Sequence, residues 1–404
     1  MPTERVSEAL RAIVASPKGR LLAGPKHFLV IEEPAYAPSG SGEHLYVEIE
    51  KEGLTSDEVA VALARVCGVK AVDVGFAGRK DRHAITRQWY SVRTPGEAQL
   101  AALHGAFAKG HLLILQTARH GNKIRVGHLR GNRFRLGLGE VRDLVQLQAS
   151  LDTLARHGIA NRFGPQRFGF GGVNLRIAAA WGRGDWAAAI ELIVDPSGAW
   201  KTGGPLPSRF RLGPEGRVMA ALKRGLEPER ALDQAEELRK LIASAGQAAV
   251  FNAVLDARAA AGLSHALREG DIACTRDGIP FLVSAADLAD VNRRAQPGEL
   301  DALTTGPMPG TWRIAPSDPI LAEERAWSAS TGLDWAWFND GGPFESPGGR
   351  RQNYVTFREP PTVKPEGEVV WVEFALPSGS FATEVLTQAG VEIPSDRSGT
   401  RSAP

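Results

Sequence analysis

Alternating apolar and polar residues indicate two strands near the start of the chain. In residues 44–50 (HLYVEIE), Leu45, Val47 and Ile49 alternate with more polar side chains, which is the period of a strand with one buried face. Residues 27–33 (HFLVIEE) predict a second strand. The segment between the two strands is rich in Pro, Gly and Ser, and it predicts a loop.

Two amphipathic helices are expected further along. Thr55 and Glu58 have the spacing of a capping box, and Gly68 is a suitable C-terminal stop, so the residues between them predict a helix. A second helix is expected over residues 144–157, ending before Gly158. Its buried stripe would consist of Leu144, Leu147, Leu151 and Leu154.

The middle of the chain has a different character from its ends. Residues 175–265 are rich in alanine with helical spacing, and strand character returns at residues 368–374 (EVVWVEF). This order predicts an α+β (mixed α/β) protein in which a helix-rich second domain is inserted into the first. The length of 404 residues also favours two hydrophobic cores. The polar end, residues 395–404, is expected to lack packed structure.

The composition limits the class of protein. The chain has no apolar run of about 18 residues, so no membrane partner is expected. Its N-terminus lacks the apolar segment of a secretory signal, which predicts a cytoplasmic location. Cys67 and Cys274 lie far apart, and they offer neither a disulfide framework nor a metal-binding knuckle.

Charge is distributed unevenly along the chain. The formal net charge is only +2, but residues 117–139 contain six arginines and lysines and no acid. Many of these cations alternate with apolar residues, which predicts strands with one basic face. Contact with nucleic-acid phosphates is the favoured interpretation. The alternative is an ordinary solvated sheet face.

One carboxylate stands in a strongly basic setting. Asp81 lies between Lys80 and Arg82, with Arg79 and Arg87 close in sequence. Neighbouring cations favour an ionised carboxylate, which suits a nucleophile or a base and not a general acid. The alternative is a surface acid that pairs with its neighbours.

Three other segments contain residues suited to RNA binding. In residues 129–134 (LRGNRF), Asn132 could orient a carboxylate and Phe134 could stack on an unpaired base; a turn Asn beside a core Phe is the alternative. In residues 376–383 (LPSGSFAT), Phe381 either enters a cleft or anchors a turn. The third segment, residues 161–169 (NRFGPQRFG), contains Arg162 and Arg167, which could reach phosphates, although a hinge is an alternative.

Several common motifs for cofactors and metals do not occur. The sequence contains no phosphate-binding P-loop, no dinucleotide fingerprint in a strand–helix setting, no GxSxG elbow and neither of the zinc motifs HExxH and HxE…CxxC. The hypotheses of a zinc hydrolase and of a zinc deaminase therefore lose support.

These segments together resemble one family, the TruD-type pseudouridine synthases. The matching pieces are FAGRKDRHAITRQW (76–89), LRGNRF (129–134), NRFGPQRFG (161–169), LPSGSFAT (376–383) and the opening PSGSGEHLYVEIEKEGLT (38–55), in the family's order. The resemblance implies a catalytic domain with a mixed sheet and flanking helices, over residues 1–160 and 356–404. It also implies an inserted α/β TRUD domain over residues 161–355.

The resemblance also implies an activity and roles for individual residues. The family isomerises uridine to pseudouridine, typically at uridine 13 of tRNA, without metal or organic cofactor. Asp81 matches its catalytic aspartate, and the target base is expected to flip out of its stack. Lys80, Asn132, Phe134 and Phe381 match the surroundings of the substrate. The candidates for contact with the RNA backbone are Arg79, Arg82, Arg87, Arg130, Arg162 and Arg167.

One departure from the family's pattern concerns its opening motif, which usually reads Lys-x-x-Pro-Glu-Asp-Phe. Here Leu22 replaces the lysine, and Lys26 and His27 replace the two acids. If that lysine serves the active site of relatives, this chain either lacks it or supplies a cation from elsewhere.

Two competing hypotheses come from other classes of protein. A non-catalytic RNA-binding or RNA-folding protein would have no need of Asp81. A nucleoside or sugar hydrolase would release free uracil and would ordinarily use two carboxylates and a water. The sequence does not separate a nucleophilic from a basic role for Asp81. It gives no signal for a dimer, so a monomer is the default expectation.

Overall fold

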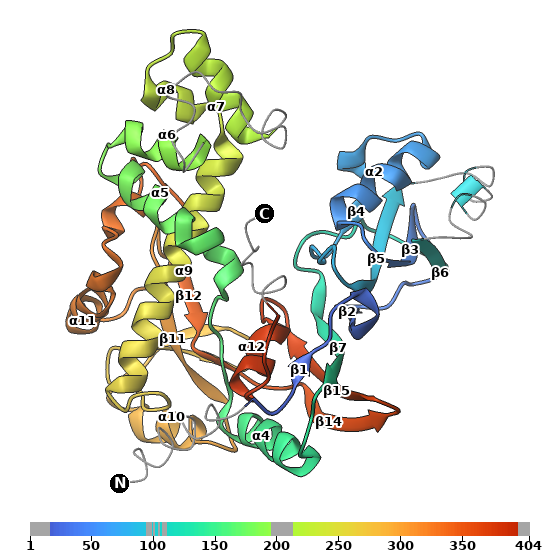
Figure 1. Cartoon of the computed structure of the whole chain (residues 1–404). Coiled ribbons are helices and arrows are strands. Elements are labelled where there is room, and N and C mark those ends of the chain that lie inside the picture. Colours follow the sequence, from blue (N-terminus) through green and yellow to red (C-terminus); the bar gives the residue numbers. More distant parts are fainter. Residues whose placement is uncertain are drawn as a thin grey trace. The chain divides into compact units, whose positions relative to one another are not determined.

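The computed structural model describes residues 17–93, 111–194 and 213–394, with four further residues between 99 and 106 (Figure 1). The polar tail at residues 395–404 lies outside the described residues. The chain divides into two compact units between Ile159 and Ala160 and again between Tyr354 and Val355. We call residues 160–354 the helical unit, and the described residues before and after it, through Pro394, the sheet unit.

The sheet unit is built on one mixed sheet. Its strand order is β14-β15-β7-β2-β5-β3-β6, with β1 beside β7 and β4 beside β5. Only β2 and β5 pair in parallel; the other pairs are antiparallel. The strands are β1 (Arg20–Leu21), β2 (Phe28–Pro34), β3 (His44–Lys51), β4 (Gly75–Phe76), β5 (Ile85–Arg93), β6 (Leu112–His120), β7 (Leu129–Gly139), β14 (Glu359–Glu366) and β15 (Val369–Pro377).

Three helices of the described residues pack on this sheet. Helix α2 (Ser56–Cys67) begins with the predicted capping box of Thr55 and Glu58, and it ends at Gly68, whose φ of 69° is left-handed. Helix α4 (Leu144–His157) begins after Asp143, whose side chain accepts a hydrogen bond from the main chain of Gln146. The third is α12 (Ala382–Gln388). Two short 3-10 helices, Pro25–His27 and Ala71–Asp73, complete the unit.

The sheet unit has two main apolar cores. Helix α2 covers β3 and β5, and its Val59 and Leu63 pack with Val47 and Ile49, the residues that the alternating pattern singled out. Helices α4 and α12 cover β7 and β15 and form the second core. The predicted strands and both predicted helices are confirmed to within three residues at their ends. The buried stripe of α4 is confirmed at Leu147, Leu151 and Leu154, whereas Leu144 is exposed and was wrongly predicted to be buried.

The helical unit contains a long central helix, α9, against which α5, α7, α8 and α11 pack. A small antiparallel sheet of order β10-β9-β11-β12 accompanies it. The helices are α5 (Val173–Gly182), α6 (Trp186–Val194), α7 (Pro214–Lys223), α8 (Pro228–Asp233), α9 (Glu236–Ala260), α10 (Leu288–Arg294) and α11 (Asp318–Ser328). The strands are β9 (Ile272–Thr275), β10 (Pro280–Leu282), β11 (Ala302–Met308) and β12 (Gly349–Gln352).

The chain passes between the two units through β8 (Ile159–Ala160) and β13 (Tyr354–Val355). The described part of the helical unit also contains 3-10 helices at Pro165–Phe168, Phe170–Gly172, Ala329–Thr331 and Trp335–Phe338. Among the described residues, no helix is long and apolar enough to cross a bilayer.

The basic strand face expected at residues 117–139 is not free of acids, so that expectation was wrong. Arg133 forms an ion pair with Glu359, with an Nη1–Oε2 distance of 2.7 Å. Arg135 forms one with Glu366, also at 2.7 Å. Both acids lie on β14, which is remote in sequence, so the segment alone could not reveal them. Residues 121–128 form a loop, not a strand.

Candidate active site

Asp81 lies on an exposed turn between β4 and β5. Its flanking residues point in different directions: Arg82 is exposed, whereas the side chain of Lys80 is buried. The main-chain carbonyl of Asp81 accepts a hydrogen bond of 2.9 Å from the Nζ of Lys51. Asp81 is therefore exposed to solvent on a turn whose main chain is held by the buried side chain of Lys51.

Lys51 is the last residue of β3 and is only 1% exposed. Burial lowers the pKa of its ammonium group to about 8, because water no longer stabilises the charge. The carboxylate of Asp81 acts in the opposite direction and raises the pKa. A buried lysine that titrates near neutral pH beside an exposed aspartate is a feature typical of functional sites.

Lys80 holds the other side of the turn. Its Nζ lies 2.5 Å from Oε2 of Glu32, and both side chains are buried. Burial raises the pKa of Glu32, while the charge of Lys80 opposes that shift. The main-chain N–H of Lys80 also donates to Oγ of Ser56, at the start of α2, at 3.0 Å. The turn is thus fixed to both β2 and α2.

Asn132 lies on β7 directly opposite Glu32 on β2 and opposite Leu376 on β15. Side chains that face each other across antiparallel strands have Cβ atoms roughly 5 Å apart. Among the described residues, Oδ1 of Asn132 is buried and has no hydrogen-bond partner. Asn132 therefore lies beside Glu32, which forms an ion pair with Lys80 next to Asp81, and its buried amide oxygen has no partner within the described residues.

The two aromatic candidates have different surroundings. Phe134 is only 7% exposed and packs in the core, with its ring centroid 5.6 Å from that of Phe374. Phe381 is half-buried and precedes the first residue of α12. It follows β15, whose Leu376 pairs with Asn132. Only a small part of the Phe134 ring is therefore accessible in the protein alone.

Four of the six arginine candidates form ion pairs. Arg79 pairs with Asp57 at 3.1 Å, Arg82 with Glu58 at 2.5 Å, Arg87 with Glu50 at 2.7 Å, and Arg162 with Asp256. Within the part of the chain that the structure describes, Arg130 and Arg167 have no acidic partner. Arg130 is exposed and donates to the carbonyl of Ala35. Arg167, in the helical unit, donates to Ser244.

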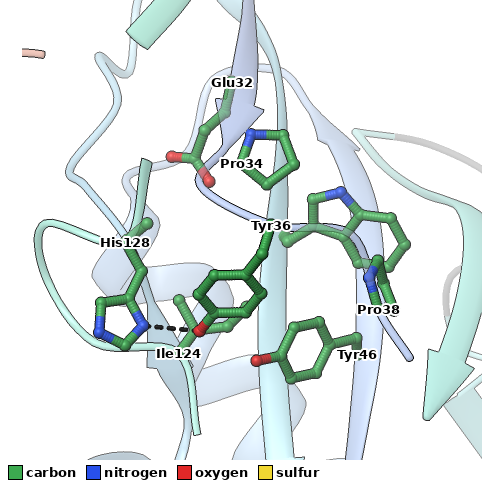
Figure 2. A pocket seen from close by; sticks show the side chains of 9 residues that line it. Glu32, Pro34, Tyr36, Pro38, Tyr46, Ile124 and His128 are labelled. Carbon is green, nitrogen blue, oxygen red and sulfur yellow. Dashed lines mark hydrogen bonds between the residues drawn. The ribbon is translucent and has the colours of Figure 1, made fainter. Parts of the chain in front are cut away.

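A small pocket borders Glu32 on the side of the loop at residues 34–38 (Figure 2). Tyr36, Tyr46, Trp89 and His128 are among its lining residues, and the Tyr36 hydroxyl lies 2.7 Å from Nδ1 of His128. Its free volume of about 10 Å³ suits one water molecule. The pocket is therefore too small for a nucleobase.

Lys51 and Glu32, which contact the turn of Asp81, were not predicted as candidates from the sequence. Each carried a signal: Lys51 continues the buried positions Val47 and Ile49 of its strand, and Glu32 continues Phe28 and Val30 of β2. A charged residue at the buried position of an alternating strand needs a partner. In both cases the partner comes from the turn at Lys80 and Asp81.

Leu22, which replaces the lysine usual in the family's opening motif, lies beside the last residues of β7. The main-chain N–H of Leu22 donates to the carbonyl of Gly137, and its side chain packs beside Gly139. Asn132 is seven residues from Gly139 along β7, or about 23 Å in an extended strand. Leu22 therefore packs at the end of β7 that is remote from Asn132. Among the described residues there is also no cluster of side chains that could hold a metal ion.

This chain is similar to known proteins over nearly its whole length. The family model for tRNA pseudouridine synthase D (TruD) matches residues 13–203 and 205–389. The protein of that name from Geobacter sulfurreducens is 37% identical over 408 residues, which cover 95% of this chain and 97% of the relative. The one from Vibrio vulnificus is 31% identical and covers 94% of each chain.

A solved crystal structure has a similar fold. A crystal structure from Methanosarcina mazei, of a candidate tRNA pseudouridine synthase D, matches with a TM-score of 0.70 at 24% identity, covering 93% of this chain and 94% of that one. Fold and relatives together define the class: the protein is an enzyme, an isomerase of the pseudouridine synthase type. Within this class, the chain belongs to the tRNA pseudouridine synthase D (TruD) family.

Proposed function

We propose that this enzyme isomerises uridine to pseudouridine in tRNA, at uridine 13, with Asp81 as its catalytic carboxylate. One observation carries the assignment: Asp81 is exposed on a turn whose main chain is held by a buried lysine, in the segment that matches the family most specifically. The names of the relatives support tRNA as the substrate.

The reaction needs no external reagent. The C1′–N1 glycosidic bond breaks, the uracil turns while still held, and a C5–C1′ bond forms; C5 loses a proton and N1 gains one. A carboxylate beside C1′ can assist cleavage by covalent attack, by removing a proton or by stabilising positive charge. Asp81 has the exposure for each role.

The remaining site residues have supporting roles in this proposal. Lys80 and Glu32 hold the turn, and the free Oδ1 of Asn132 accepts a hydrogen bond from the substrate. The uridine leaves its stack and rests against Phe381 and the accessible edge of Phe134. Arg130 contacts the RNA backbone. The sheet unit is the catalytic domain, and the helical unit is the inserted TRUD domain.

The test is to map pseudouridine by carbodiimide labelling and primer extension. RNA would come from cells that lack the gene, and from the same cells with wild-type or Asp81→Ala protein restored. The proposal predicts that one tRNA position, uridine 13, loses its mark and that only the wild-type protein restores it. The Asp81→Ala protein should still bind the tRNA, because it retains the cations.

Other outcomes would change the assignment. A mark restored by Asp81→Ala would remove Asp81 from the catalytic role. Restoration at a different uridine would correct the position. Free uracil in the reaction mixture would indicate a hydrolase, and an unchanged RNA with tight binding would favour a non-catalytic RNA-binding protein.

A further inference from the structure

We propose that Lys51 is the positioning residue for Asp81, and that the positive charge on its Nζ is required for the full rate of the reaction. The inference rests on the proposed catalytic role of Asp81 and extends it to a residue outside the catalytic turn.

Within the described part of the chain, the side chain of Lys51 makes one hydrogen bond, and its acceptor is in the turn of Asp81. Its side chain is buried at the end of β3, and its Nζ donates to the carbonyl of Asp81 at 2.9 Å. The residues directly opposite it, Thr86 on β5 and Leu112 on β6, are uncharged. A lysine placed under a turn in this way fixes the turn's main chain, and with it the direction in which the carboxylate of Asp81 points.

The charged groups that influence Lys51 come from two elements. Asp81, Lys80 and Arg82 lie on the turn, and Glu58 lies in the first turn of α2. Glu58 and Arg82 already form an ion pair with each other, as Lys80 does with Glu32. Asp81 is therefore the acid whose charge Lys51 is placed to balance.

Keeping a charged group at this position has a cost. Burial disfavours the ammonium ion and brings its pKa to about 8. Methionine has a similar length and would fill the space without that cost. Since the carbonyl of Asp81 belongs to an exposed residue, it could bind water instead. Stability alone thus gives no reason for a lysine here, whereas a requirement at the catalytic turn does.

The charge also determines how firmly the turn is held. A hydrogen bond from an ammonium ion is roughly twice as strong as one from a neutral amine. When the pH rises through about 8, Lys51 loses its proton, and the contact with Asp81 weakens. Because misplacement of a reacting group by about 1 Å can cost roughly 100-fold in rate, the rate should fall over the same pH range.

The experiment compares three proteins with a full-length uridine-containing tRNA transcript between pH 6 and pH 10. The wild type should show a fall in kcat on the alkaline side near pH 8. In Lys51→Arg, whose guanidinium keeps its charge, this fall should move to higher pH. Lys51→Met should lower kcat about 10- to 100-fold, with little change in KM and no fall near pH 8.

Two controls separate this inference from the function it rests on. Lys18→Met removes another partly buried lysine with a lowered pKa, held against Ser150 of α4, and it should leave the pH profile unchanged. Asp81→Asn should be inactive at every pH; if it is active, the proposed function fails. Ionisation of the uracil itself would act equally on the wild type and Lys51→Arg, so only a difference between them reports on Lys51.

The stability of the variants completes the test. If Lys51 only supports the fold, Lys51→Met should lower Tm at pH 7 and reduce kcat in proportion to the unfolded fraction. We expect Tm to be unchanged or higher. An identical alkaline fall in the wild type and Lys51→Arg, or full activity of a well-folded Lys51→Met, would overturn the inference.

Discussion

At the scale of single residues, two buried lysines fix the turn of Asp81 by different means. Lys80 is neutralised by Glu32, an acid that is itself only 4% exposed, whereas Lys51 has a main-chain carbonyl as its hydrogen-bond acceptor. The ion pair of Lys80 and Glu32 is buried and mainly supports the structure. The ammonium group of Lys51 keeps a charge with a pKa of about 8. The two lysines should therefore respond differently to substitution and to pH.

Replacing Lys80 with methionine should destabilise the protein by about 3–5 kcal/mol at pH 8, because it leaves the carboxylate of Glu32 buried and unpaired. The pKa of Glu32 is already raised by burial, and loss of Lys80 raises it further. The folded variant then keeps a proton that the unfolded chain releases, so its stability falls as the pH rises above the ordinary range of a glutamate. Urea unfolding at pH 5 and pH 8 measures this.

The wild type should thus differ from Lys80→Met less at pH 5 than at pH 8. The double variant Lys80→Met with Glu32→Gln is the control, since it contains no buried charge at this place. It should recover much of the lost stability and show the smaller pH dependence. An equal loss of stability for Lys80→Met at both pH values would mean that Glu32 is not the responsible group.

At the scale of the elements, close contact between β7 and β15 positions Asn132 and the segment that leads to Phe381. Gly131 on β7 pairs with Pro377 beside the Asn132–Leu376 pair. A Cβ added at Gly131 would lie only 2.1 Å from the carbonyl oxygen of Leu376. Only a residue without a side chain allows the two strands to approach this closely. Asn132 and the segment leading to Phe381 depend on that approach.

Gly131→Ala should therefore separate the strands and lower the free energy of unfolding by about 1–3 kcal/mol, with a loss of activity beyond the loss of folded protein. Chemical denaturation and kcat, measured on the same preparation, check both effects. Gly121→Ala is the matched control, because no atom lies within 4 Å of a Cβ added there. A Gly131→Ala protein as stable and active as this control would contradict the close packing.

The elements were largely predictable from the sequence, but some of their partners were not. Alternation and capping residues gave β2, β3, α2 and α4, because those signals are local. The acids that balance Arg133 and Arg135 come from β14, and Phe134 packs against Phe374 of β15. Such contacts depend on which strands become neighbours. The sequence pattern places Lys51 and Glu32 at buried strand positions, but only the fold identifies their partners.

At the scale of the whole molecule, a net charge of +2 gives little general attraction for RNA, so a few cations must act locally. Most arginines near the catalytic turn already have acidic partners. Their phosphate contacts would first require release of those acids. Arg130 requires no such exchange, because it is exposed and its side chain donates a hydrogen bond to the carbonyl group of Ala35.

Arg130→Gln should therefore weaken tRNA binding and reduce the slope of log K against log salt by about 1, as expected for the loss of one phosphate contact. Fluorescence anisotropy over a range of salt concentrations measures the slope. Arg293→Gln is the control: Arg293 is also exposed, but it pairs with Asp290 on a helix outside the candidate segments. Equal slopes for both variants would exclude Arg130 as a phosphate contact.

The interrupted course of the chain through the sheet unit has a consequence for protein synthesis. Strand β7 lies between β2, which precedes it, and β15, which the ribosome makes only after the entire helical unit. Until then β7 has one open edge, and Asn132 lacks Leu376 beside it. A polypeptide released early, anywhere within the helical unit, would contain Asp81 and Lys51 and would still lack the β15 neighbour of Asn132. The pairing that places Leu376 beside Asn132 can therefore form only after the helical unit has been made.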